Sequence, residues 1–186
     1  MKTSDFVMCV IGAMNGKVTG RTLLQKTCYF VSVQLEHEID LDFRAHYYGP
    51  YSPTIDNALA RMTDLGFVEQ RTKGFGAADS AGFEIKRNDY EFTEEGEEIF
   101  ELLRKQKGLE YTRIREAVKN IKDAGDPGYF ELSIAAKAYF IIHSQGGALT
   151  KGAIRSEARE LGWEVESHSL DRAVNFLEKL NLVRAS

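Results

Sequence analysis

The stretch PTIDNALARMTDLGFVEQRTKGFG, residues 53–76, contains the signals for a helix, a stop and a strand in succession. Pro53 suits the first position of a helix, because its missing N–H would have no partner there. Apolar residues then recur at helical spacing, and Gly66 is typical of the residue just past a helix end. The sequence therefore predicts a helix over residues 53–65 that runs directly into a strand. The residues expected on its buried face are Ile55, Ala58, Leu59, Met62 and Leu65.

The neighbouring segments extend this plan on both sides. Upstream, apolar residues at helical spacing predict helices near the start of the chain and over residues 21–36. Downstream, GFEIKRNDYEF (82–92) favours a second strand after a polar loop, and Thr93 suits the cap of a further helix. Helices followed by a β-hairpin, the wing, are the plan of a winged helix. The sequence thus predicts a mainly α fold with a small β-hairpin (α+β), with the winged helix-turn-helix in residues 1–107.

The window YYGPYSP, residues 47–53, immediately precedes the helix and holds three of the eight tyrosines. Gly49 permits a tight bend, Pro50 fixes φ, and Ser52 is a favourable N-cap residue. Before the window, EIDLDFRAHY (38–47) alternates apolar and polar residues, which predicts a half-buried strand. We therefore interpret the window as a rigid joint between a strand and a helix.

The rest of the chain is predicted to be helical. A connecting helix over residues 108–124 has a narrow apolar seam, which could pack on the first domain or on a second copy of the chain. GDPG at 125–128 is the predicted boundary. Residues 129–186 resemble a degenerate, winged-helix-like unit of three helices, with a strand starting at NLV (181–183). The seam consists of Tyr111, Ile114, Val118 and Ile121.

Composition limits the function classes. The net charge is −4 over 186 residues, and no segment is basic, which counts against strong non-specific binding to nucleic acid. No apolar run approaches the ~18 residues that a membrane span needs, and the first residues do not resemble a signal peptide. We expect a cytoplasmic protein in which Cys9 and Cys28 are buried, reduced thiols.

Two segments carry a family resemblance. LLQKTCYF (23–30) and YYGPYSP (47–53), the latter followed by a helix ending in LGFVE, resemble the YwgA-like group of winged-helix proteins. More distantly, they resemble the SocA-type antitoxin domain, also called Panacea. Those families share an LQK-x-x-YF helix, a YGPYS-like turn and a helix that runs into GLI or GFV. The resemblance covers the N-terminal half of the chain. Winged-helix membership implies DNA binding, whereas antitoxin-type relatives imply neutralisation of a protein toxin.

The first functional hypothesis is a DNA-binding transcriptional regulator. In a winged helix, the helix before the wing usually enters the major groove, and the wing contacts phosphates. Asn and Arg side chains can read base edges, although Asp56 and Asp64 on the same helix would face phosphates unfavourably. Dimerisation through the seam would supply a second half-site, so we expect a homodimer. The candidate residues are Thr54, Asn57 and Arg61 for the groove, and Arg71, Lys73, Lys86 and Arg87 for phosphates.

The alternative hypothesis is an antitoxin-like protein-binding module that does not contact DNA. Exposed aromatic residues on a rigid joint make good binding residues. The same tyrosines could instead be buried in the corner between strand and helix. The candidates for protein binding are Tyr47, Tyr48, Tyr51 and Phe75.

Catalysis and metal binding have little support. Glu38, Asp40 and Asp42 would share one face of the predicted strand, where carboxylates could hold a cation, but a solvated strand face is the commoner explanation. The four histidines are scattered, and no nucleophile, phosphate-loop or zinc motif stands in a fitting context. We expect no enzymatic activity, no metal and no cofactor.

Overall fold

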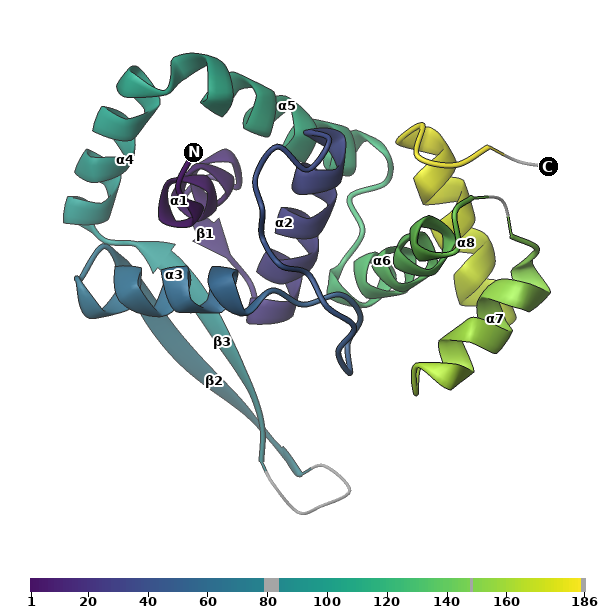
Figure 1. Cartoon of the computed structure of the whole chain (residues 1–186). Helices are drawn as coiled ribbons and strands as arrows, with labels where there is room; N and C mark the ends of the chain where they lie inside the picture. Colours follow the sequence, from purple (N-terminus) through teal and green to yellow (C-terminus); the bar gives the residue numbers. More distant parts are fainter. Residues whose placement is uncertain (79–83, 148, 185–186) are drawn as a thin grey trace.

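The computed structural model describes residues 1–78, 84–147 and 149–184. This part of the chain contains eight α-helices and a three-stranded antiparallel sheet (Figure 1), which confirms the mainly helical α+β class. The helices are α1 (Thr3–Ala13), α2 (Arg21–Gln34), α3 (Pro53–Asp64), α4 (Glu94–Gln106), α5 (Gly108–Asp123), α6 (Tyr129–Ser144), α7 (Lys151–Glu160) and α8 (Ser167–Lys179). The strands are β1 (Lys17–Val18), β2 (Val68–Ala78) and β3 (Glu84–Phe92).

The sheet has the strand order β1-β3-β2. β1 pairs with β3 through Lys17↔Glu91 and Val18↔Tyr90. The hairpin β2–β3 projects away from the helices (Figure 1). The predicted loop between its strands, residues 76–82, lies largely outside the described residues.

Local sequence signals set the bounds of α3 as expected. The Ser52 hydroxyl accepts a hydrogen bond from the backbone N–H of Ile55 at 3.2 Å, and Pro53 occupies the first turn. Gly66, with φ of 77°, ends the helix. The predicted buried face is confirmed except for Leu65, which is 62% exposed because the helix ends one residue earlier.

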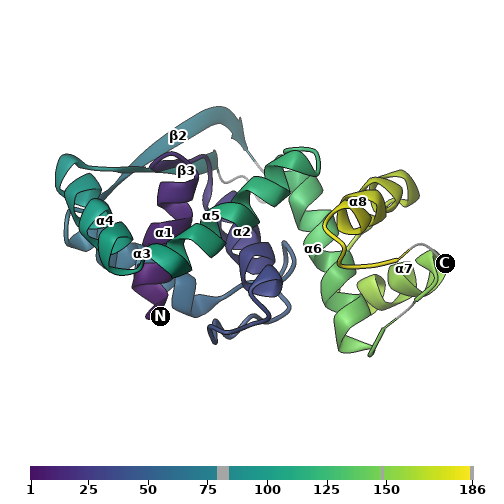
Figure 2. The same ribbon diagram turned by 90° about the horizontal axis from the view of Figure 1, so that it is seen from above.

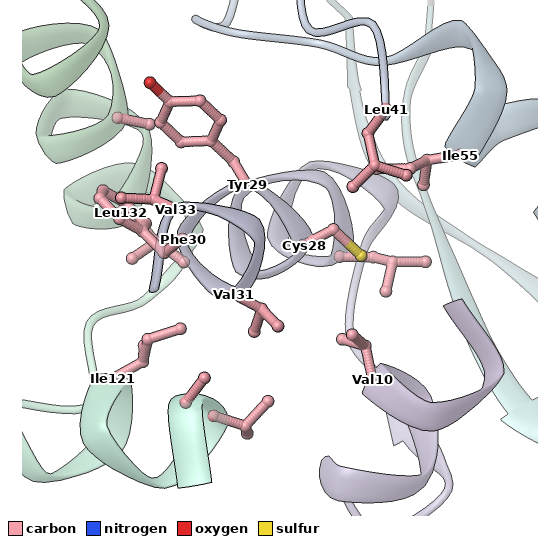
Figure 3. Packing of buried hydrophobic residues seen from close by; sticks show 14 of the residues in the cluster. Val10, Cys28, Tyr29, Phe30, Val31, Val33, Leu41, Ile55, Ile121 and Leu132 are labelled. Carbon is pink, nitrogen blue, oxygen red and sulfur yellow. The ribbon is translucent and has the colours of Figure 1, made fainter. Parts of the chain in front are cut away.

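Helix α2 lies at the centre of the molecule, and its residues Leu24–Val33 are all buried. Figure 3 shows Phe30 beside Leu132 of α6, while Cys28 lies on the side of α2 that faces Ile55 of α3. Both Cys28 and Cys9 are buried free thiols, as predicted. A helix buried on all sides must place any polar residue it carries against a specific partner.

The predicted strand over residues 38–47 is wrong. The segment is an extended loop with one bridge, in which the backbone N–H of Arg44 donates to the carbonyl of Tyr51 and the reverse bond also forms, both at 2.9 Å. Left-handed φ values at Glu36, His37 and Asp42 interrupt the extended backbone. Among the residues that the structure describes, no neighbouring strand continues the pairing. The alternation therefore reflects partial burial of the segment on the core.

The apolar seam of α5 packs inside the molecule. Tyr111, Ile114, Val118 and Ile121 are between 1% and 8% exposed, and they belong to the continuous hydrophobic core. The seam therefore offers no surface to a second copy of the chain, and dimerisation through it is excluded. A homodimer formed through another surface stays a prediction.

Helices α6, α7 and α8 lie together at one end of the molecule in Figure 2. They join the first five helices through α2, where the Phe30 and Phe176 rings meet edge to face at 5.5 Å. Asn181, with φ of 56°, follows α8, and the predicted strand from residue 181 does not form among residues up to 184. The domain boundaries at residues 107 and 125–128 remain predictions. No helix in the described part of the chain is long and apolar enough to span a membrane.

Candidate functional site

Two side chains of α2 bind the backbone of the segment His46–Ser52, which we call the tyrosine turn. The Gln25 side chain pairs with the backbone of Ser52: its amide donates to the Ser52 carbonyl at 2.9 Å, and its oxygen accepts from the Ser52 N–H at 3.0 Å. The Lys26 ammonium donates to the carbonyl of Pro50 at 2.7 Å. Gln25 and Lys26 are each only 2% exposed. The two segments that carry the family resemblance are therefore in direct contact.

The other end of the tyrosine turn is held by the C-terminal helices. Trp163, which follows α7 and is 1% exposed, donates its indole N–H to the carbonyl of His46 at 2.6 Å. Lys137 of α6 packs against the turn at Gly49, where an added Cβ would come within 3.0 Å of the Lys137 side chain. Gly49 also has φ of 96°, so both its conformation and its surroundings favour glycine. The backbone of the turn is thus fixed from two sides.

The tyrosines of the turn divide into two groups. Tyr47 and Tyr48 are 72% and 55% exposed, and their rings meet edge to face at 4.9 Å. Tyr51 is half-buried and donates its hydroxyl to Asp56 at 2.7 Å. Burial and this hydrogen bond raise the pKa of Tyr51 to about 12. Of the four aromatic candidates, Phe75 stands apart on β2 and is 50% exposed. The turn therefore presents two aromatic rings to solvent and uses the third internally.

Beneath the turn, Asp56 of α3 joins several polar side chains. It accepts hydrogen bonds from Arg21 at 3.1 Å, from Gln25 at 3.2 Å and from Tyr51. Arg21 also donates to the Tyr90 hydroxyl of β3 at 3.2 Å. This network links α2, α3, the turn and the sheet.

Lys26 has an unusual environment for a lysine. Burial, and secondarily the positive charge of Lys137, lower the pKa of Lys26 to about 7. The Pro50 carbonyl is its one hydrogen-bond acceptor among the described residues. The pKa of Lys137 is lowered as well, by burial. Two lysines thus share a buried region, and no carboxylate in the described part of the chain bonds to Lys26.

The predicted groove-reading residues of α3 have different surroundings. Asn57 and Arg61 are exposed, but Thr54 is half-buried and donates its hydroxyl to the carbonyl of Leu41 at 3.2 Å. Thr54 thus contributes to the packing of the loop that precedes the tyrosine turn. Asn57 and Arg61 remain on the surface beside Asp64.

On the hairpin, the arginines pair with carboxylates of the same hairpin. Arg71 contacts Glu69 at 2.7 Å and Glu91 at 3.2 Å. Arg87 contacts Asp89 at 2.7 Å, and its guanidinium lies 5.6 Å from the centre of the Phe75 ring. The two predicted lysines are exposed: Lys73 lies opposite Arg87 in the strand register, and Lys86 lies opposite Gly74. The four basic candidates thus lie on one hairpin, together with the three carboxylates that pair with its arginines, Glu69, Asp89 and Glu91.

The acidic residues that were predicted to share one strand face do not form a cluster, and two of them pair with arginines instead. Glu38 forms a two-pronged ion pair with Arg113 of α5 at 2.7 Å, and Asp42 pairs with Arg44. Within the described residues, no group of three or more His, Cys, Asp or Glu side chains could hold a metal ion.

The sequence did not identify Gln25, Lys26 and Trp163 as part of this site. A signal was present for two of them, because Gln25 and Lys26 interrupt an otherwise apolar helix face. Polar residues in a fully buried helix usually have a specific partner, and here the partner is the backbone of the turn. Trp163 gave no comparable signal, because its contact joins residues 117 positions apart.

The sequence matches no protein-family model, and the search of curated proteins finds no match either. The resemblance to YwgA-like and antitoxin-type proteins therefore stays a prediction that rests on the motif residues.

Proposed function

We propose that this chain is a non-enzymatic protein of the winged-helix class that binds another protein through the tyrosine turn. The observation that carries the proposal is the exposure of Tyr47 and Tyr48 on a backbone held by buried side chains. Tyrosine is enriched among the residues that dominate binding energy at interfaces. A fixed backbone also reduces the conformational entropy that binding would cost.

The winged-helix class is supported by the order of elements. The succession α1, β1, α2, α3, β2, β3 places a helix directly before a β-hairpin, and the short strand β1 completes the sheet next to β3. On this scaffold the tyrosine turn is the connection that enters α3, so it lies at the start of the helix that would read DNA in other members of the class.

A DNA-binding regulator is the second candidate, favoured by the exposed Asn57 and Arg61 on α3 and by the basic hairpin residues. The hairpin carboxylates weaken this candidate. Exposed ion pairs are worth only about 0–1 kcal/mol, so phosphates could displace them. The released carboxylates of Glu69, Glu91 and Asp89 would nevertheless stay close to the phosphates and repel them.

The proposal is tested by affinity capture from cells that express the protein, followed by binding measurements with the purified partner. The test variant is Tyr47→Ala with Tyr48→Ala. Tyr129→Ala is the matched control, because Tyr129 is 58% exposed at the start of α6 and lies outside the turn. We expect the double variant to bind the partner about 30-fold more weakly or worse, and the control to bind as the parent does.

Two results would count against protein binding by the turn. One is a partner that the double variant and the parent bind with equal affinity. The other is the absence of any specific partner together with tight DNA binding that weakens steeply with salt, which would favour the regulator.

A further inference from the structure

A cavity lies beside the tyrosine turn, and the proposed protein binding by the exposed rings does not use it. Its volume is about 300 Å³, at the lower end of the range for small-molecule sites. The walls come from the first turns of α2, from His46, Tyr48 and Tyr51 of the tyrosine turn, and from Asp56 of α3. Residues from three separate segments therefore converge on one space.

Two residues that line this cavity, Arg21 and Lys26, carry side chains that donate hydrogen bonds and, when charged, accept none. Asp56 is the one carboxylate among the lining residues, and it already accepts hydrogen bonds from Arg21, Gln25 and Tyr51. Arg21 uses its Nε for Tyr90 and its Nη1 for Asp56, which leaves Nη2 without a hydrogen-bond partner among the described residues. A guanidinium has five N–H donors and no acceptor. The cavity therefore offers more donors than its own carboxylate can satisfy.

Lys26 adds a buried cation to the same wall. Its side chain lines the cavity, is only 2% exposed and donates one hydrogen bond, to the carbonyl of Pro50. An ammonium group has three N–H donors, and a buried cation with no opposite charge is costly. The low pKa of Lys26 reflects this cost. A bound anion would supply both the missing acceptor and the missing charge.

We propose that this cavity binds a small organic oxyanion, whose carboxylate or phosphate group is held by Arg21 and Lys26 and whose body lies against the rings of His46 and Tyr48. Arg and Lys together are a common pair for such groups, because the guanidinium fork matches two oxygens and the ammonium adds a point charge. The aromatic rings supply an apolar surface for the rest of the ligand. This site goes beyond protein binding, although it shares Tyr48 with the tyrosine turn.

Fluorescence of Trp163 can report on binding. Trp163 is the single tryptophan of the chain, and its indole N–H donates to the carbonyl of His46, a residue of the cavity wall. The probes are inorganic phosphate, adenosine monophosphate and benzoate, each titrated against sodium chloride at matched ionic strength. We expect at least one probe to give a saturable change below about 10 mM, and chloride to give none. Saturation by phosphate compounds alone, or by benzoate alone, identifies the head group.

Variants locate the binding. Arg21→Gln and Lys26→Met should each weaken binding at least about 10-fold, because each removes a charge-assisted hydrogen bond. Lys17→Gln is the control, since it removes the same charge from exposed β1, where Lys17 pairs with Glu91. If Lys26→Met does not fold, Arg21→Gln alone tests the site. The Arg21 side chain is 49% exposed, so we expect this variant to fold.

Either of two results would overturn the proposal. The first is the absence of saturation with all three probes up to about 10 mM. The second is unchanged affinity in Arg21→Gln. Tyr47→Ala, which lies outside the cavity wall, should leave ligand binding intact even where partner binding is lost.

Discussion

The tyrosine turn and the β2–β3 hairpin are both exposed surfaces with residues suited to recognition, but they are built differently. The turn is connected to the core by buried side chains from α2 and by Trp163, and its exposed groups are apolar rings. The hairpin projects from the body (Figure 1), and its arginines pair with its own carboxylates. Residue type alone made both surfaces candidates. Their contacts separate them: the turn presents exposed rings on a fixed backbone, whereas the arginines of the hairpin already have carboxylate partners.

The largest expected effect comes from removing the support of the turn. Gln25→Ala would leave the buried N–H of Ser52 without a partner and would leave the Ser52 carbonyl with only the long bond from the Asp56 N–H at 3.4 Å, at a cost of about 2–3 kcal/mol. Urea unfolding measures this loss. Gln70→Ala, an exposed position on β2, is the control and should change stability by less than about 0.5 kcal/mol. An equal effect of both substitutions would remove the distinction between the two regions.

The next effect concerns the buried charge beneath the turn. Because the pKa of Lys26 is lowered from 10.5 to about 7, the unfolded chain holds a proton between these values that the folded chain has lost. Stability must then rise with pH in this window, by at most about 1.4 kcal/mol per pH unit. Burial raises the pKa of Cys9 and Cys28 above 9.0, which lowers stability only at higher pH.

Urea unfolding at pH 7 and pH 8.5 tests this linkage. The parent should gain about 1–2 kcal/mol between these two conditions, and Lys26→Met should lose most of that gain. A variant that keeps the full pH dependence of the parent would show that Lys26 is not the titrating group. Charge changes on the hairpin, where the side chains are exposed, should not alter the pH dependence in this range.

A smaller effect is expected at the other support of the turn. Trp163→Phe keeps an aromatic ring beside Phe140 but loses the hydrogen bond to the carbonyl of His46. We expect a loss of about 1 kcal/mol in stability, together with faster amide hydrogen exchange in residues 46–49. Unchanged exchange in the turn would indicate that α2 alone fixes it.

The smallest effect on stability is expected on the hairpin. Arg71→Glu with Lys73→Glu alters exposed pairs and should change the free energy of unfolding by less than about 1 kcal/mol. The same double variant tests the second candidate function through fluorescence anisotropy with DNA across a salt series. If the parent binds DNA and the reversal abolishes that binding, the hairpin is a phosphate-contacting surface and the comparison between the two regions is reversed.

Elements whose bounds depend on neighbouring residues could be predicted from the sequence, whereas elements that depend on distant partners could not. The start and end of α3 follow from Ser52, Pro53 and Gly66, whose preferences act within a few residues. The prediction of a strand at residues 38–47 was wrong because an alternating pattern indicates burial of one face but does not show that a partner strand is present. The sequence also could not show whether Tyr47 and Tyr48 are exposed.

The supporting residues of the site depend on tertiary contacts. Gln25 meets Ser52 across 27 positions, and Trp163 meets His46 across 117. The seam on α5 was visible as a pattern, but the pattern could not show whether α1 and α2 or a second copy of the chain would cover it. The structure resolves both kinds of contact because it shows which surfaces are already occupied.

The most direct test of the central claim measures partner binding by two double variants side by side. One removes the rings of the turn, Tyr47→Ala with Tyr48→Ala, and the other reverses the hairpin charges, Arg71→Glu with Lys73→Glu. Binding of the captured partner to each purified variant is compared with binding to the parent by calorimetry. Our account predicts that the turn variant loses the partner while the hairpin variant retains it. Retention by the turn variant and loss by the hairpin variant would contradict it.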